Sequence, residues 1–174
     1  AKAVAVELAE NAWADRERYR PDMMALGDAT ALAHDVNKNP HLPAVLFADP
    51  ADNPGGGGRG NTITILKSFL DSRIQNCVVA VFYDRAAVDT AFEAGEGETI
   101  TLTLNSNEPS PFSEKLDVEA RIDKLSQGVF ISEYGMVAGK TVDTGRTAVV
   151  SVNGIQIVII SKRQQCLSVD FLSA

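Results

Sequence analysis

The chain has 174 residues, of which 45% are hydrophobic and 22% are charged, and its formal net charge is −7. This length fits one domain, and the composition is ordinary for a globular protein. The acidic balance and the lack of any Lys or Arg block argue against a nucleic-acid partner or an anionic membrane partner. No apolar run approaches the ~20 residues that a membrane span needs, so we expect a cytoplasmic protein.

The first segment of the chain has a helical pattern. Apolar residues recur at spacings of three and four, which predicts a helix from Ala1 to about Arg20, where Pro21 stops it. Because the chain starts inside this helix and without an initiator Met, we expect it to be a fragment of a longer protein. Asp28 is expected to cap a second helix over residues 29–37. The apolar stripe of the first helix consists of Ala5, Leu8, Ala9, Ala12 and Trp13.

The next segments predict a strand, a glycine-rich loop, a helix and a second strand. Residues 44–48 form a short apolar run, residues 49–62 contain the glycines, and residues 63–73 are amphipathic. Residues 77–83 are continuously apolar, which is typical of a strand covered on both faces. This βαβ order predicts that the two strands pair in parallel. Asp84 is expected to cap the helix that follows.

The second half of the chain changes to the period of a strand. Apolar residues alternate with polar ones at 100–104 and at 116–122, which predicts half-buried strands. The pair Asn153-Gly154 predicts a tight hairpin, because a type I′ turn needs positive φ at both central residues. We therefore predict an α/β fold of mixed α+β character, in which a βαβ core carries a mixed sheet extended by antiparallel strands and a hairpin. All 174 residues are expected to form a single domain.

The glycine-rich loop is the main candidate for a functional site. Glycine lets a backbone turn sharply or come close to a ligand, and ligands of open α/β sheets bind at the carboxyl ends of strands. The structural alternative is that Asp52 makes an Asx-turn and that Asn61 or Thr62 only caps the next helix. We expect substrate-side contacts from Asp52, Asn53, Gly55, Gly56, Gly57, Arg59, Asn61 and Thr62.

Two phosphate-binding motifs partly match the same loop. Gly55 to Thr62 has the Walker A spacing, but Asn61 stands where the Lys that reaches the phosphates is required. The dinucleotide pattern of Gly55, Gly57 and Gly60 also matches, but residues 49–54 separate it from the preceding run. One alternative function is therefore an independent α/β module that binds a phosphorylated small molecule or nucleotide at this loop. A second alternative is a purely structural or dimerisation domain.

The run Asp-x-x-Asp-Asn-Pro-Gly-Gly-Gly resembles the signature of the C-terminal domain of the MlrC (microcystinase C) family. In this sequence the run consists of Asp49, Asp52, Asn53, Pro54, Gly55, Gly56 and Gly57. Weaker similarity follows in the expected order along nearly the whole chain, from about Trp13 to Asp170. Its segments are residues 60–62, 79–84, 86–88, 94–97, 145–150 and 161–164.

The resemblance implies a part of a bacterial metallopeptidase-like hydrolase, from a family named for degrading linearised microcystin peptides. In that family Asp and His residues of an N-terminal domain hold zinc, and this sequence does not contain that domain. The resemblance therefore implies no metal or cofactor in this chain and no identified catalytic residue. Its implied partners are the N-terminal catalytic domain and a peptide-like small substrate, and a homo-oligomer remains open. We expect the chain alone to be inactive.

The histidines agree with that expectation. His34 and His41 lie seven residues apart with Pro40 between them, so they do not form the His-x-x-x-His pair of a zinc-binding helix. We expect the chain to dock on the absent catalytic domain and to shape its substrate site through the glycine loop.

Overall fold

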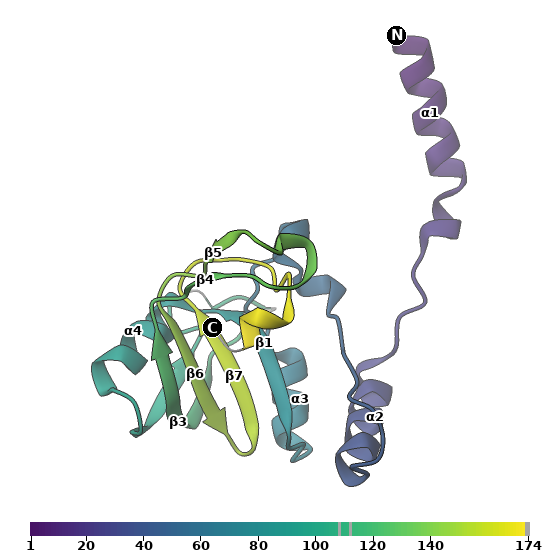
Figure 1. The fold of residues 1–174 in the computed structure, drawn as a ribbon. Coiled ribbons are helices and arrows are strands. Elements are labelled where there is room, and N and C mark those ends of the chain that lie inside the picture. Colours follow the sequence, from purple (N-terminus) through teal and green to yellow (C-terminus); the bar gives the residue numbers. More distant parts are fainter. Residues whose placement is uncertain (108, 112, 173–174) are drawn as a thin grey trace.

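A five-stranded mixed sheet forms the centre of the computed structural model, which describes residues 1–107, 109–111 and 113–172 (Figure 1). In spatial order the strands are β1, β7, β6, β3 and β2. β1 runs parallel to β7, and the other neighbouring strands are antiparallel. The predicted mixed α/β class is therefore confirmed. The strands are β1 (Cys77–Tyr83), β2 (Thr99–Leu104), β3 (Leu116–Ser126), β6 (Thr147–Val152) and β7 (Ile155–Ile160).

The α-helices lie around this sheet or extend away from it. They are α1 (Lys2–Ala14), α2 (Leu26–Lys38), α3 (Thr64–Asp71) and α4 (Arg85–Ala94). α4 packs against β2, β3, β6 and β7, and α2 packs against α3, which lies near the edge strand β1 (Figure 1). α1 stands clear of the rest of the molecule. No helix in the described part of the chain combines the length and the apolar character needed to cross a membrane.

The hairpin of β6 and β7 is confirmed. Asn153 has φ 50° and Gly154 has φ 86°, so both central residues have the positive φ that a type I′ turn requires. The ladder starts directly beside the turn, where Val152 pairs with Ile155. β7 is buried at every position except Gln156, because it lies between β1 and β6 and both of its faces are covered.

The segment at residues 44–48 was predicted to be a strand, and this prediction is wrong. The segment has no ladder partner, and the Leu46 side chain is 93% exposed. Pro43 and Pro50, which have no N–H to donate to a ladder, flank the run and limit any strand to a few residues. Only Phe47 reaches the body, where its ring packs edge-to-face on Phe69 with centroids 5.8 Å apart.

The parallel partner of β1 is consequently β7 and not the 44–48 segment. This places β1 at the edge of the sheet, with one neighbour. Its predicted burial on both faces is also wrong, because Val78 is 44% exposed and only Phe82 is fully buried. Continuous apolar sequence did not distinguish an edge strand from a central one.

The caps of α2 and α4 had different outcomes. α2 begins at Leu26, so Asp28 lies inside its first turn and does not cap it. The predicted cap of α4 is confirmed, since the Asp84 side chain accepts a hydrogen bond from the Ala87 N–H. α4 ends at Ala94 and is followed by the C-cap residue Gly95, which has φ 96°.

A second, two-stranded sheet and the end of the chain pack together. β4 (Val129–Ile131) pairs with β5 (Thr141–Asp143), and the C-terminal 3₁₀ turn spans Val169–Leu172. Phe130 of β4 packs edge-to-face on the buried Phe171, with ring centroids 5.4 Å apart. This small sheet was not predicted, because its strands have only three residues each.

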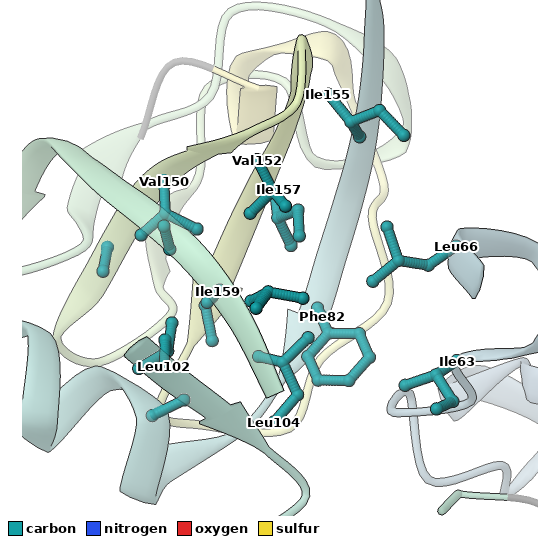
Figure 2. Close-up of a cluster of buried hydrophobic side chains, with 14 of the residues drawn as sticks. Ile63, Leu66, Phe82, Leu102, Leu104, Val150, Val152, Ile155, Ile157 and Ile159 are labelled. Atoms are coloured by element: carbon teal, nitrogen blue, oxygen red, sulfur yellow. The ribbon is translucent and has the colours of Figure 1, made fainter. Parts of the chain in front are cut away.

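The hydrophobic core lies between the sheet and the helices. Figure 2 shows Leu102, Leu104, Val150, Ile157 and Ile159 from the sheet converging with Phe82 of β1, while Ile63 and Leu66 approach from the α3 side. Side chains of this size stabilise the fold by about 1.5–3 kcal/mol each when fully buried. The core therefore fixes the start of α3, where the glycine-rich loop ends, and the carboxyl end of β1, beside which the loop lies.

Candidate functional site

The base of the glycine loop, residues 49–62, is held by Asp52. Its Oδ1 accepts a hydrogen bond from the Gly60 N–H at 2.7 Å, and its Oδ2 accepts one from the Thr62 N–H at 2.7 Å. Both carboxylate oxygens therefore bond to the far side of the loop and close it into a ring. Asp52 does not make the Asx-turn that was predicted as its structural alternative.

The upper part of the loop is a short 3₁₀ turn organised by Asn53. The Asn53 Oδ1 accepts from the Gly56 N–H at 3.2 Å, and its backbone oxygen accepts from Gly58 at 2.8 Å. Gly57 has φ 97°, a conformation that side-chain-bearing residues rarely adopt. A Cβ on Gly58 would lie 2.7 Å from the Asn53 backbone nitrogen. These two positions explain why glycine is required in this run.

The end of the loop is anchored in the protein interior through Asn61. Its side chain is buried, and its Nδ2 donates to Asn105 Oδ1 at 2.9 Å. The Ser113 hydroxyl donates to Asn61 Oδ1 at 2.8 Å, and the Asn105 amide donates back to the Asn61 carbonyl at 2.9 Å. Neither Asn61 nor Thr62 caps α3, whose N-cap is Ile63, so that structural alternative is wrong too.

Asp84 joins the same network to the sheet and to α4. Its Oδ2 accepts from the Asn105 N–H at 2.6 Å, while its Oδ1 caps α4. The Tyr83 N–H donates to the Gly60 carbonyl at 2.7 Å, and the Asp84 N–H donates to Ile160 at 3.1 Å. The loop therefore lies at the carboxyl end of the parallel pair β1 and β7, although no strand precedes it.

A polar hollow of about 500 Å³ opens beside this network. The junction of β1 and α4 lines part of it, and the segment after β2 lines another part together with Asn61. Asp89 of α4 also lines the hollow and pairs with Arg146, whose guanidinium lies 4.9 Å from the centre of the Phe92 ring. The charged and amide side chains that line the hollow are Asn61, Asp84, Arg85, Asp89, Asn105 and Asn107.

The predicted site residues divide into two groups. Asn53, Gly55, Gly56, Gly57 and Arg59 are exposed at the tip and rim of the loop. Asp52 and Thr62 are half-buried at its base, and Asn61 is buried. The structure therefore brings together a rigid base and an accessible glycine tip, and the contact of either group with a substrate stays a prediction.

Sequence reasoning missed the partners of the base. Asn105 and Ser113 fall between the predicted strands at 100–104 and 116–122, where no site residue was predicted, and Asp84 was recognised as a helix cap but not as a partner of Asn105. One signal was present: an Asn directly after a strand tolerates positive φ, and Asn105 has φ 56°.

The described residues provide no metal centre. Across 1–107, 109–111 and 113–172, no group of three His, Cys, Asp or Glu side chains could hold a metal ion. His34 is half-buried in α2, whereas His41 is exposed beyond it. A zinc ion of the kind that the family resemblance implies therefore does not fit the donors of this part of the chain.

Comparison with known proteins identifies the family. A family model described as the MlrC C-terminus matches residues 47–174, about three quarters of the chain. The chain belongs to the MlrC C-terminus family. This confirms the resemblance seen in the sequence, and the model starts at Phe47, so residues 1–46 lie outside it.

Two individual proteins are similar to this MlrC C-terminal chain. Microcystinase C of Sphingomonas sp. is 28% identical over 130 residues, which cover 75% of this chain and 25% of that protein. The crystal structure of a "putative metallopeptidase" from Mesorhizobium sp. BNC1 has a TM-score of 0.75 at 22% identity. The match covers 91% of this chain and 31% of that one, so the chain spans less than a third of either relative's length.

Proposed function

We propose that the chain is the C-terminal domain of an MlrC-like hydrolase and docks on a metal-binding catalytic domain of the same polypeptide. The observation that carries this proposal is the match to the MlrC C-terminus model by a chain that spans a quarter of Microcystinase C. The lack of a metal-ligand cluster among the described residues is consistent with a division of labour, in which another domain holds the metal.

Within that hydrolase, the glycine loop shapes the substrate side of the active site. Asp52 and the Asn61–Asn105 pair hold its base, so the tip is presented in one conformation. Gly55, Gly56 and Gly57 at the tip are exposed and carry no side chain that would obstruct a close approach. A peptide-like small substrate, which offers backbone amides, suits such a surface. The chain on its own has no hydrolytic activity.

The decisive experiment adds one methyl group to the tip in the longer, catalytically active polypeptide. Gly56→Ala is suitable, because the nearest atom to its Cβ is Asn53 Cγ at 3.7 Å and its φ is not in the positive range. We expect turnover of a linear peptide to fall about tenfold or more, equivalent to about 1.4 kcal/mol in the transition state, with an unchanged Tm.

Gly27→Ala is the matched control, because a Cβ on Gly27 meets nothing within 4 Å and Gly27 lies in α2, away from the loop. It should leave turnover unchanged. Unchanged turnover for Gly56→Ala as well would remove the tip from the substrate site, and the docking proposal would then stand without it.

The geometry does not favour the nucleotide-binding alternative. A phosphate loop needs backbone N–H groups that point at the ligand, but the N–H groups of Gly56, Gly57 and Gly58 already donate to carbonyls of residues 53–54. Calorimetric titration of ATP or NAD into the chain should therefore give no saturable signal. Micromolar binding that is lost in Gly57→Val would instead establish the alternative.

A further inference from the structure

The N-terminal helix α1 is the least covered element of the molecule. None of its residues is buried, and Figure 1 shows it projecting from the body on an extended connection. The Leu8 side chain is 64% exposed, and the indole of Trp13 is 70% exposed. A free helix of this length is marginal in water, and α1 has no side-chain N-cap. Its exposed apolar side chains therefore need a partner.

The apolar surface covers more than half of the circumference of α1. At about 100° per residue, its apolar residues span an arc of about 200°. Only Lys2, at the first helical position, interrupts that arc. The opposite arc carries Glu7, Glu10 and Asn11 beside two alanines. A helix with so wide an apolar surface is typical of one packed inside a domain and not of one lying on a surface. The arc consists of Val4, Leu8, Ala12, Ala5, Ala9, Trp13 and Val6.

Exposed apolar side chains recur after the helix, although charged residues such as Arg16, Arg18 and Arg20 stand among them. Tyr19, Met23 and Met24, in the turn and connection after α1, are each more than half exposed. The body's own packing starts with α2, where Ala33 is buried and the Thr30 and Ser68 hydroxyls lie 2.9 Å apart across to α3. Residues 1–25, called the N-terminal arm below, therefore lie outside the core of this domain and expose several large apolar side chains.

The comparisons favour another domain of the same polypeptide as the partner of this surface. The family model of the C-terminal domain starts only at Phe47, which leaves the N-terminal arm outside the conserved domain. The Mesorhizobium structure nevertheless covers 91% of this chain, so the shared fold extends into the segment before Phe47. That protein and Microcystinase C both have more than two thirds of their length outside the match.

We propose that α1 is a core helix of the neighbouring N-terminal domain, so that the boundary between the two domains lies in the connection between α1 and α2. The inference rests on the proposed function, because it requires a longer polypeptide with such a domain. The apolar arc, which contains Ala5 and Ala9, packs into an apolar groove of that domain, and the arc of Glu7 and Glu10 faces water.

Hydrogen exchange measured by mass spectrometry tests this assignment, because it reports on the peptide 2–14 separately. In the 174-residue chain we expect its amides to exchange nearly as fast as those of an unfolded peptide. In the longer polypeptide we expect exchange that is slower by about 100-fold or more. Equal exchange in the two proteins would overturn the inference, even if the longer polypeptide is fully active.

A matched pair of substitutions in the longer polypeptide adds specificity. Ala9→Glu places a charge inside the apolar arc, whereas Ala3→Glu places the same charge between Glu7 and Glu10 on the polar arc. Ala9→Glu should restore fast exchange in peptide 2–14, and Ala3→Glu should not. The same response from both variants would contradict the proposed orientation.

A second copy of the chain is the competing occupant, and Trp13 can detect it because it is the only tryptophan. We expect the 174-residue chain to sediment as a monomer, with the emission of an exposed indole at low and high concentration. A dimer whose emission shifts to the blue, and which Ala9→Glu dissociates, would assign the apolar arc to self-association and overturn the proposal. Unchanged turnover in Gly56→Ala would count against the proposed role of the loop tip, and it would leave this assignment of α1 unaffected.

Discussion

Asn61 and Asn105 hold each other through two hydrogen bonds, although 44 positions separate them in the sequence. The Asn61 amide donates to the Asn105 side-chain oxygen, and the Asn105 amide donates to the Asn61 backbone carbonyl, each at 2.9 Å. Both residues are buried. The pair therefore connects the end of the glycine loop to the end of β2, and the position of the loop depends on it.

Removing this pair should destabilise the fold. In Asn61→Ala, Asn105 Oδ1 and the Ser113 hydroxyl lose their partner in a buried environment, so we expect the free energy of unfolding to fall by about 1–3 kcal/mol. Urea denaturation followed by circular dichroism measures the change. Asn107→Ala, at an exposed position of the same hollow, should cost less than about 0.5 kcal/mol. Equal effects would show that the buried pair contributes little.

The glycine run should tolerate alanine at one position and not at another. Gly57→Ala forces a side chain into φ 97°, and we expect a loss of about 1–2 kcal/mol. Gly56→Ala should be nearly neutral, because its Cβ has space. Thermal unfolding of the two variants compares them directly, and a lower Tm for Gly56→Ala than for Gly57→Ala would contradict the loop conformation.

Acid should weaken the attachment of the C-terminal turn. The Ser132 hydroxyl, and then the Ser168 hydroxyl and the Tyr134 and Glu133 N–H groups, hold the pKa of Asp170 below its ordinary value of about 3.9. Because the folded-state pKa is the lower one, this stabilisation is present at neutral pH. It is lost as the pH falls below the ordinary Asp range and through the folded value.

Unfolding by urea at a series of acidic pH values measures that loss. Ser132→Ala removes the donor with the largest effect, so it should raise the Asp170 pKa and move the loss of stability to higher pH. An unchanged acid limb in Ser132→Ala would show that this hydrogen bond does not control the titration of Asp170.

The two cysteines should react slowly. Cys77 and Cys166 are free thiols, and burial raises the pKa of both above the ordinary value. Since the thiolate is the reactive form, modification by a disulfide reagent at neutral pH should be slower than for an exposed cysteine, and its rate should rise with pH. Urea should abolish the difference. Fast reaction of both thiols in the folded protein would contradict their partial burial.

The chain should not retain zinc. Among the described residues neither His34 nor His41 belongs to a group of three potential metal ligands, so the chain should contain well under one zinc per molecule after dialysis. Elemental analysis of the purified 174-residue chain measures the content. Stoichiometric, tightly bound zinc would show that the metal site is at least partly in this chain.

Local chemistry made several elements predictable from the sequence. Asn153-Gly154 specifies a turn whose φ values few other residues adopt, and Asp84 caps α4 through a contact three residues away. The alternation in β2 and β3 predicted their faces because each strand has one side toward the core. In each case the determining interaction is local or periodic, so a single sequence contains it.

The failures concern properties that depend on distant residues. Residues 44–48 are apolar enough for a strand, but whether they join the sheet depends on a free edge and on Pro43 and Pro50. Asn61 differs from a surface loop residue through its contacts with Asn105 and Ser113, which both lie outside any local window. The loop was therefore predictable as a candidate site, while the residues that hold its base were not.

The topology also determines when this part of the molecule can form. β1 has β7 as its one sheet neighbour, and Cys77 pairs with Ile155 while Tyr83 pairs with Ile160. During synthesis β1 leaves the ribosome well before β7 has been made, so both edges of β1 stay unpaired until then. A protein truncated before β7 would keep every residue of the glycine loop and lose the sheet partner of β1, the strand beside whose carboxyl end the loop lies. The glycine loop near the start of the domain can therefore reach its folded position only when the C-terminal strand β7 is intact.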